Sequence, residues 1–289
     1  MSTTRRRASS AGSSRSRSTE RTTWSSARCS TCSRPATRTS SAGATARWDA
    51  SCQSRPIEPR RRQAIMKLYE VPWSIHPRRV GVYLAEKGIE GIERVQVAPP
   101  PDRTRRIIEG VTIAGTVPAL DIGDGQVIGS SLAILEYLEE RFPSPDLIGA
   151  TPVERARTRE FITVIEEATV YLRIWAFNGS RLFAAEVAQD KAVARAGMAA
   201  WLGKLQLLER MVADRGGAFL TGDRLTTADC VGFALLQTTT ELFGVPIPED
   251  CPSLQGWYRR FSARPSAAVP DFPPVLGLSR GLVQQTQEG

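Results

Sequence analysis

The sequence predicts a small α/β domain followed by an all-helical domain, and three features of the chain indicate this architecture. Residues 66–142 alternate runs of strand composition with segments of helical spacing, in the order strand, helix, strand, helix, strand, strand, helix. Residues 152–270 carry apolar side chains at helical spacing with little strand character. Between them, residues 143–151 contain two prolines and a glycine, which is typical of a linker.

The first domain is expected to begin with a strand at Met66–Val71, where apolar and polar residues alternate. After a turn over residues 72–76, Pro77 suits the first position of a helix, because its missing N–H would be unpaired there anyway. Gly88 predicts the end of that helix. Arg94–Val97 is the second expected strand.

A connection, a hairpin and a helix are expected to complete this domain. Residues 98–116 contain Pro and Gly and leave room for a short helix at residues 104–109. Residues 117–122 and 126–128 have strand character, and the Gly-Asp-Gly between them is a hairpin signal. Ser131 then opens a helix whose apolar residues keep helical spacing.

The second domain is expected to consist of helices that end before a tail, residues 271–289. Thr226 and Asp229 have the spacing of a capping box, in which each side chain satisfies a free N–H at the start of a helix. Composition after Gly277 is polar and predicts a loose C-terminus. The expected helices span residues 152–177, 184–214, 227–243 and 252–263.

Residues 1–65 differ in composition from the rest of the chain. They hold 15 Ser, 9 Thr and 14 Arg but no Leu, Val, Phe or Tyr, so they cannot bury enough apolar surface to order a chain. We therefore expect a disordered leader. The composition is also typical of GC-rich DNA read in an unintended frame, which favours a translation start at Met66. A transit peptide, an RNA-binding Arg-Ser tract and a half metal site at Cys29 and Cys32 are weaker interpretations.

Charge and cysteine content exclude several classes of protein. The whole chain has a formal charge of +8, yet the leader alone carries 14 Arg against three acidic residues. The remaining 224 residues hold 24 basic and 27 acidic side chains, so a nucleic-acid groove is not expected. No apolar run approaches the ~18 residues of a membrane helix. Only Cys230 and Cys251 lie in the expected fold, which favours a reducing, cytoplasmic location.

Four motifs in order resemble one family. Residues 77–89 resemble its first helix, residues 115–120 its Val-Pro turn and third strand, and residues 130–138 the helix that follows. Residues 225–229 resemble the buried capping motif of its second domain. Met66–Pro270 thus resembles the cytosolic glutathione transferases, of the theta- or zeta-like bacterial type. The resemblance implies a thioredoxin-like domain at residues 66–142, an all-helical domain at 152–270, and glutathione as co-substrate.

The resemblance also implies where glutathione would bind. In the family the proline equivalent to Pro118 is cis, and the backbone of the preceding residue, here Val117, pairs with the cysteinyl part of glutathione as an added strand does. Ser131, at a helix N-terminus, would hold the γ-glutamyl carboxylate, where free N–H groups and the helix dipole favour an anion. The family usually has Glu or Gln at position 130. The shorter Ser130 here implies that one contact to the ligand's ammonium is missing.

Ser74 is the expected catalytic residue. Its position resembles that of the catalytic Ser in zeta- and theta-like transferases. A hydroxyl there would donate to the glutathione sulfur and favour the reactive thiolate, without acting as nucleophile. The alternatives are that Ser74 merely caps the turn, that His76 is the donor, or that a bound water activates the thiol. The positive charges of the neighbouring Arg78 and Arg79 are unfavourable at a helix N-terminus. Either a nearby anion compensates these charges, or one of the two side chains points to solvent.

The second substrate is expected to be a small apolar electrophile. Tyr171, Trp175 and Phe177, together with His76, are candidates to line its pocket, although aromatic residues at such spacing also form helix cores. The first functional hypothesis is therefore conjugation of glutathione in detoxification. A scaffold protein with little catalysis, or a glutathione-dependent isomerase, dehalogenase or lyase, is the alternative. Family members commonly form two-fold dimers, so the resemblance implies a homodimer. No metal is expected.

Overall fold

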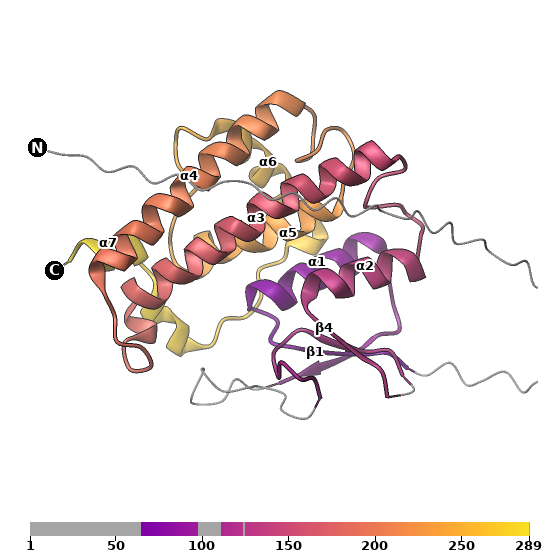
Figure 1. Ribbon diagram of the computed structural model, residues 1–289, viewed down its shortest axis with the longest axis horizontal. Coiled ribbons are helices and arrows are strands. Elements are labelled where there is room, and N and C mark those ends of the chain that lie inside the picture. The colour runs from indigo at the N-terminus through magenta and orange to yellow at the C-terminus, as the bar shows by residue number, and fades with distance from the viewer. Residues whose placement is uncertain (1–64, 98–110, 124, 289) are drawn as a thin grey trace, which may run out of the picture. The chain divides into compact units, whose positions relative to one another are not determined.

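The computed structural model describes residues 65–97, 111–123 and 125–288. The leader expected at residues 1–65 and the short helix expected at residues 104–109 therefore lie outside the described residues, apart from Ile65. Within the described part, an α/β domain is followed by a helical one, as expected (Figure 1).

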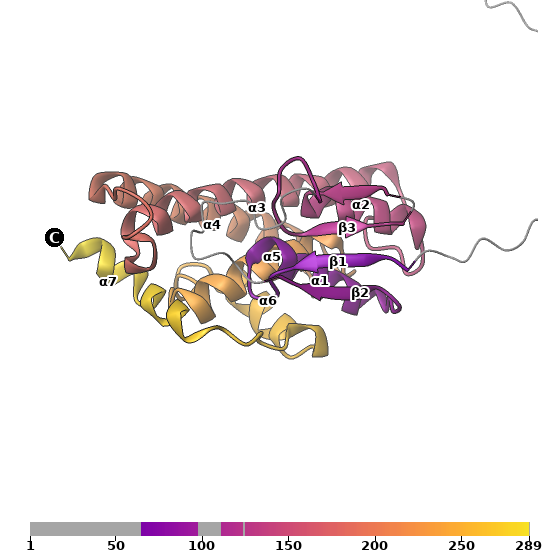
Figure 2. The ribbon, with the colours of Figure 1, turned by 90° about the horizontal axis from the view of Figure 1, so that it is seen from below.

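A four-stranded mixed sheet forms the base of the first domain. Its order is β2-β1-β3-β4, with β1 (Lys67–Glu70) parallel to β2 (Glu93–Gln96) and antiparallel to β3 (Ala119–Asp121). β4 (Val127–Gly129) pairs with β3 through the expected hairpin. Figure 2 shows β1 in the middle of the sheet, between β2 and β3. One of the two inner strands, β1, therefore leads directly into the first helix.

Alternation along β1 sets which side of the sheet is buried. Leu68 is fully buried and is paired in register with Leu120 of β3, while Lys67 and Tyr69 point to the other side. Buried Glu70 accepts two hydrogen bonds from Arg94 of β2, at 2.7 and 2.6 Å. Because its charge is paired, this carboxylate can be buried in a strand that also contributes to the core.

Two helices cover one face of this sheet, between the strands and the second domain (Figure 1). The first, α1 (Ile75–Lys87), begins two residues earlier than expected, so Pro77 lies at its third position. Proline is tolerated there because the N–H groups of the first turn have no intrahelical acceptor. Gly88 ends α1 in the left-handed conformation, with φ 66°. The second helix, α2 (Ser131–Arg141), begins at the expected residue.

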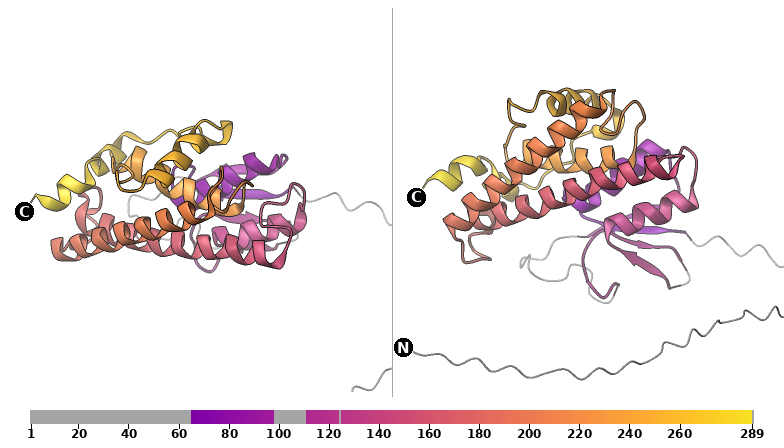
Figure 3. Two further views of the ribbon diagram at one scale, coloured as in Figure 1. Left: turned by 90° about the horizontal axis from the view of Figure 1, so that it is seen from above. Right: turned by 45° about the horizontal axis from the view of Figure 1, so that its top comes forward.

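The helical domain is built on two long helices that run side by side, α3 (Pro152–Gly179) and α4 (Lys191–Arg215) (Figure 3). Gly197 permits their close approach, since a Cβ there would lie 2.9 Å from the Trp175 backbone nitrogen. Before the C-terminal segment, the other helical segments are α5 (Thr227–Gln237), a π-helical turn η2 (Thr238–Leu242), α6 (Pro252–Ser262), and short 3₁₀ turns η1 (Arg181–Phe183), η3 (Pro265–Ala267) and η4 (Pro274–Ser279).

Helix α4 starts seven residues later than the expected residue 184. The Asp190 side chain accepts hydrogen bonds from the backbone N–H groups of Ala192 and Val193, which makes Asp190 the N-cap. Before it, Ser180 caps the separate turn η1 through the Leu182 N–H. The Asp190 cap thus sets the start of α4, and residues 184–190, which periodicity placed in the helix, lie before it.

The expectation of a loose C-terminal tail is wrong. The last described segment forms α7 (Leu282–Gln287), and its Leu282 and Thr286 side chains are fully buried. Thr286 Oγ1 accepts a 2.7 Å hydrogen bond from the Trp175 indole of α3. The prediction of an exposed tail rested on polar composition alone. Composition does not show that the Thr286 hydroxyl is buried as the acceptor of the Trp175 indole N–H.

The two arginines at the start of α1 join the domains. Arg78 donates to the Gln237 side chain at 2.7 Å and to the carbonyl oxygens of Ser266 and Ala268. Arg79 is fully buried, with its Nη1 2.6 Å from Glu166 Oε1 of α3, although the angle is not that of a directed hydrogen bond. Neither arginine points to solvent. Acceptors of the second domain therefore compensate both charges.

No helix of the described residues is both long and apolar enough to cross a bilayer. Among the same residues, no cluster of three or more His, Cys, Asp or Glu side chains has an arrangement suited to a metal ion.

Candidate active site

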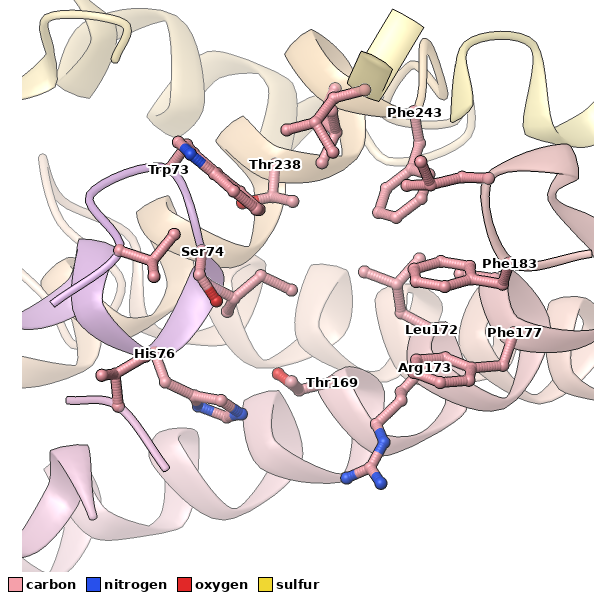
Figure 4. A pocket seen from close by; sticks show the side chains of 17 residues that line it. Trp73, Ser74, His76, Thr169, Leu172, Arg173, Phe177, Phe183, Thr238 and Phe243 are labelled. Carbon is pink, nitrogen blue, oxygen red and sulfur yellow. The ribbon is translucent and has the colours of Figure 1, made fainter. Parts of the chain in front are cut away.

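A pocket of about 260 Å³ opens where the N-terminus of α1 meets the helical domain. Its walls come from the loop before α1 and the first turn of α1, from Val117 shortly before β3, from one face of α3, and from the η1, η2 and η4 segments (Figure 4). Most of its lining is aliphatic or aromatic. The lining residues are Val71, Trp73, Ser74, Ile75, His76, Val117, Thr169, Leu172, Arg173, Ala176, Phe177, Leu182, Phe183, Thr238, Leu242, Phe243 and Leu276.

Ser74 occupies the N-cap position of α1 and lines this pocket. Its backbone is held from both sides, since its N–H donates to Val71 O at 2.9 Å and its carbonyl accepts from Arg78 N at 2.8 Å. Its side chain, however, forms no capping hydrogen bond. The interpretation of Ser74 as a plain cap is therefore not supported. Its hydroxyl is held in place by the backbone and remains available to a ligand.

Val117, which precedes β3 in the same domain as Ser74, lines the same pocket. The Val117–Pro118 peptide bond is cis, as the resemblance implied, and Pro118 is buried directly before β3. Within the described residues, the ladder of β3 begins only at Ala119, so the Val117 N–H and C=O take no part in it. An extended peptide can pair with such a backbone as an additional strand does.

Ser130 and Ser131 lie at the start of α2 and do not line the pocket. Ser131 is buried and is the first residue of the helix, where backbone N–H groups lack intrahelical acceptors. Ser130 is exposed, and its φ of 71° is the one positive φ of a non-glycine residue within the described part of the chain. Such conformations cost about 1–3 kcal/mol and concentrate at ligand sites.

The His76 ring points into the pocket from the first turn of α1 (Figure 4). Burial, followed by the charges of Arg79 and Arg173, lowers the pKa of His76 from 6.5 to about 4. The imidazole is therefore neutral at pH 7, and one ring nitrogen donates while the other accepts. A neutral ring beside Ser74 can orient a polar group of a ligand but cannot offer a full positive charge.

Two of the aromatic residues predicted to line the pocket do not reach it. Trp175 is buried against Trp201, at 5.5 Å between ring centroids, and Tyr171 packs on the core. The α3 residues that line the pocket are Thr169, Leu172, Arg173, Ala176 and Phe177. The first four follow i, i+3, i+4, i+7 spacing, which is one face of a helix, whereas positions 171 and 175 lie on another face.

Several lining residues were missed at the level of sequence, among them Trp73, Arg173 and Phe243. Trp73 directly precedes Ser74, so its position beside the predicted catalytic residue could have been read from the sequence. Arg173 shares a helical face with Leu172 and Ala176, and this can be read from their spacing in the sequence. The spacing does not show which face of the helix lines the cavity. Phe243 is separated from Ser74 by 169 residues along the chain. No local pattern could have linked these two residues.

Family models match both parts of the chain. A model described as "Glutathione S-transferase, N-terminal domain" matches residues 73–141, and one described as "Glutathione S-transferase, C-terminal domain" matches residues 183–268. Together they cover more than half of the sequence. The first match includes the start of α1, and the second includes the pocket residues Phe183, Thr238, Leu242 and Phe243.

Individual proteins are similar over most of their length. A maleylacetoacetate isomerase of Pseudomonas aeruginosa is 30% identical over 220 residues, covering 72% of this chain and 93% of that protein. Glutathione S-transferase 2 of Saccharomyces cerevisiae is 26% identical over 210 residues, covering 70% and 87%. The crystal structure of a glutathione S-transferase from Rhodospirillum rubrum superposes with a TM-score of 0.61 at 28% identity, covering 73% of this chain and 95% of that one.

Proposed function

This chain belongs to the glutathione S-transferase family, and on that premise we propose that it binds glutathione beside Val117 and transfers the thiolate to a small apolar electrophile. One observation carries the proposal. Ser74 and Val117, which the family resemblance assigns to glutathione, line the same pocket as apolar side chains of the helical domain. A thiol held by the first domain would thus face an electrophile held by the second.

Glutathione is proposed to lie in extended form against the Val117 backbone, with its γ-glutamyl carboxylate at the N-terminus of α2. Buried Ser131 and the free N–H groups of the first turn favour an anion at that end. Ser130 is too short to reach far toward the ammonium group. Because of that missing contact, binding is expected to be weaker than in relatives with a carboxylate or amide at this position.

Ser74 is proposed to activate the sulfur. Its free hydroxyl donates a hydrogen bond to the thiolate and stabilises the charged form, which raises the concentration of the nucleophile at neutral pH. With an aryl chloride, the thiolate sulfur forms a bond to the ring carbon and the carbon–chlorine bond breaks. Chloride leaves, and the thiol proton passes to solvent. Exclusion of water by the apolar walls strengthens the hydrogen bond.

A glutathione-dependent isomerase is the second candidate function. The 30% identity to a maleylacetoacetate isomerase over 220 residues favours it. In that reaction class glutathione would add to a double bond, permit rotation, and leave unchanged. The same Ser74 hydroxyl would serve both reactions, so the site alone does not choose between them. A cytoplasmic homodimer belongs to the same proposal, and light scattering after size exclusion tests the dimer.

Titration calorimetry of the full chain with glutathione, followed by conjugation to 1-chloro-2,4-dinitrobenzene, tests the proposal. Ser74→Ala should lower kcat/KM about 10- to 100-fold, because a hydrogen bond to a charged group contributes about 1.5–3 kcal/mol. Ser262→Ala, on the exposed end of α6 and outside the pocket, is the matched control.

Each outcome of these measurements has a distinct meaning. Absence of binding heat would refute glutathione as ligand. Binding without turnover of either a conjugation or an isomerisation substrate would favour a scaffold protein. Unchanged turnover in Ser74→Ala would transfer the activating role to His76 or a water.

A further inference from the structure

We propose that the second substrate carries an anionic group, such as a carboxylate, on an otherwise apolar body, and that Arg173 pairs with this anion at the edge of the pocket. The inference rests on the proposed function, because it names the class of electrophile that the same pocket accepts. The proposed function requires only that the electrophile be apolar, and this inference adds that it carries a negative charge.

The charge of the pocket is the first observation. Among its lining residues, Arg173 is the one whose side chain is charged at pH 7, because His76 is neutral there. The lining otherwise consists of hydrocarbon, aromatic rings and hydroxyl groups. An apolar cavity with a single cation at its edge matches a ligand that is apolar along its body and negative at one end.

The partners of Arg173 are the second observation. Within the described part of the chain, no carboxylate forms an ion pair with its guanidinium, which lies over the Phe177 ring at 5.7 Å from the centroid. By contrast, the neighbouring basic residues Arg79 and Lys204 pair with acidic residues of α3. Stacking on an aromatic ring orients the planar group but does not neutralise it.

The position of Arg173 on α3 is the third observation. It shares one helical face with Thr169, Leu172 and Ala176, and all four line the pocket. Figure 4 shows its guanidinium and the His76 ring at the same edge of the cavity, with the Thr169 side chain between them. The Arg173 charge also acts on His76. A carboxylate at this edge would meet a bidentate donor and, beside it, a neutral imidazole and a hydroxyl.

A matched pair of electrophiles tests the inference. 4-Chloro-3,5-dinitrobenzoate and 4-chloro-3,5-dinitrobenzamide share the ring, leaving group and activating groups, and differ in charge. Each enzymatic kcat/KM is divided by the rate constant of the uncatalysed reaction with glutathione. The wild type should prefer the benzoate about tenfold, which corresponds to the lower end of the range for hydrogen bonds to charged groups. Arg173→Gln should abolish the preference, and Arg173→Lys should retain part of it.

Arg157→Gln is the control, since it removes the same charge from an exposed position of α3 outside the pocket. It should leave the benzoate-to-benzamide ratio unchanged. The KM for glutathione should be the same in Arg173→Gln and wild type. An equal rate with both electrophiles, or a ratio that Arg173→Gln does not change, would overturn the inference. So would a raised KM for glutathione with an unchanged ratio, because Arg173 would then belong to the glutathione site.

A binding measurement separates this inference from the proposed function. Calorimetry with 3,5-dinitrobenzoate and 3,5-dinitrobenzamide, which have no leaving group, needs no turnover. If conjugation fails but the benzoate still binds about tenfold more tightly in an Arg173-dependent manner, the inference stands and the proposed reaction falls. If conjugation proceeds and the two compounds bind equally, the proposed function stands and the inference falls.

Discussion

Asp229 offers a sharp test of how the helical domain is held together. It lies at the third position of α5, is fully buried, and completes the capping box expected with Thr226. Its Oδ2 accepts from the Thr226 N–H at 2.8 Å and from the Thr226 hydroxyl at 3.0 Å. Its Oδ1 accepts from the Leu220 N–H and the Trp257 indole, both at 2.8 Å. Four donors from three segments therefore converge on one carboxylate.

The magnitude follows from counting donors that lose an acceptor. In Asp229→Asn, the new amide nitrogen is best placed toward Thr226, because the Thr226 hydroxyl can rotate and accept a hydrogen bond from it. The Thr226 backbone N–H then loses its acceptor, so one buried N–H is orphaned. An orphaned buried donor costs about 1–3 kcal/mol, and we expect about 2 kcal/mol of lost unfolding free energy. Asp229→Ala orphans three N–H groups and leaves a cavity, so about 4–5 kcal/mol is expected. The order wild type, Asn, Ala is the central expectation.

Urea denaturation at pH 7, followed by tryptophan fluorescence and far-ultraviolet circular dichroism, measures the series. Asp223→Asn removes the same charge from an exposed site beside the motif and should change the unfolding free energy by less than about 0.5 kcal/mol. The reasoning is refuted if Asp229→Asn is as stable as wild type, or if Asp229→Ala is no less stable than Asp229→Asn. Either result would mean that water or rearranged backbone satisfies the donors.

Two further predictions concern the candidate site. The pKa of His76 is about 4 when folded and about 6.5 when unfolded, so the unfolded chain binds more protons between these values. Stability is thus full above pH 6.5 and falls as pH decreases. In urea titrations, the wild type should therefore lose about 2 kcal/mol of unfolding free energy between pH 7 and pH 5 because of His76, and His76→Gln should not show this loss. The same pH dependence in wild type and variant would contradict this. Ser130→Gly should stabilise the protein by about 1 kcal/mol, because the relief of a positive φ exceeds the entropic cost of glycine. Calorimetry should then show a midpoint raised by about 2–4 °C, whereas a lowered midpoint would argue that the Ser130 backbone is not strained.

Local signals were sufficient for the motifs that are contiguous in the chain. The strand before Ser74, the Val117-Pro118 turn, the helix start at Ser131 and the Thr226–Asp229 cap all depend on side chains within a few residues of one another. Their chemistry is that of turns and caps, which a short window of sequence specifies. The order of these motifs also predicted the two-domain architecture and the family.

Tertiary structure alone decided what the pocket contains. Periodicity predicts that α3 is a helix but not that Arg173 faces the cavity while Trp175 faces Trp201, because that choice depends on where α4 and α7 pack. The same holds for Arg79, whose charge is compensated by Glu166 of α3, 87 residues away along the chain. The residues of one local motif constrain each other through the backbone that joins them. The walls of a pocket between domains share no such backbone and come together only when the chain folds.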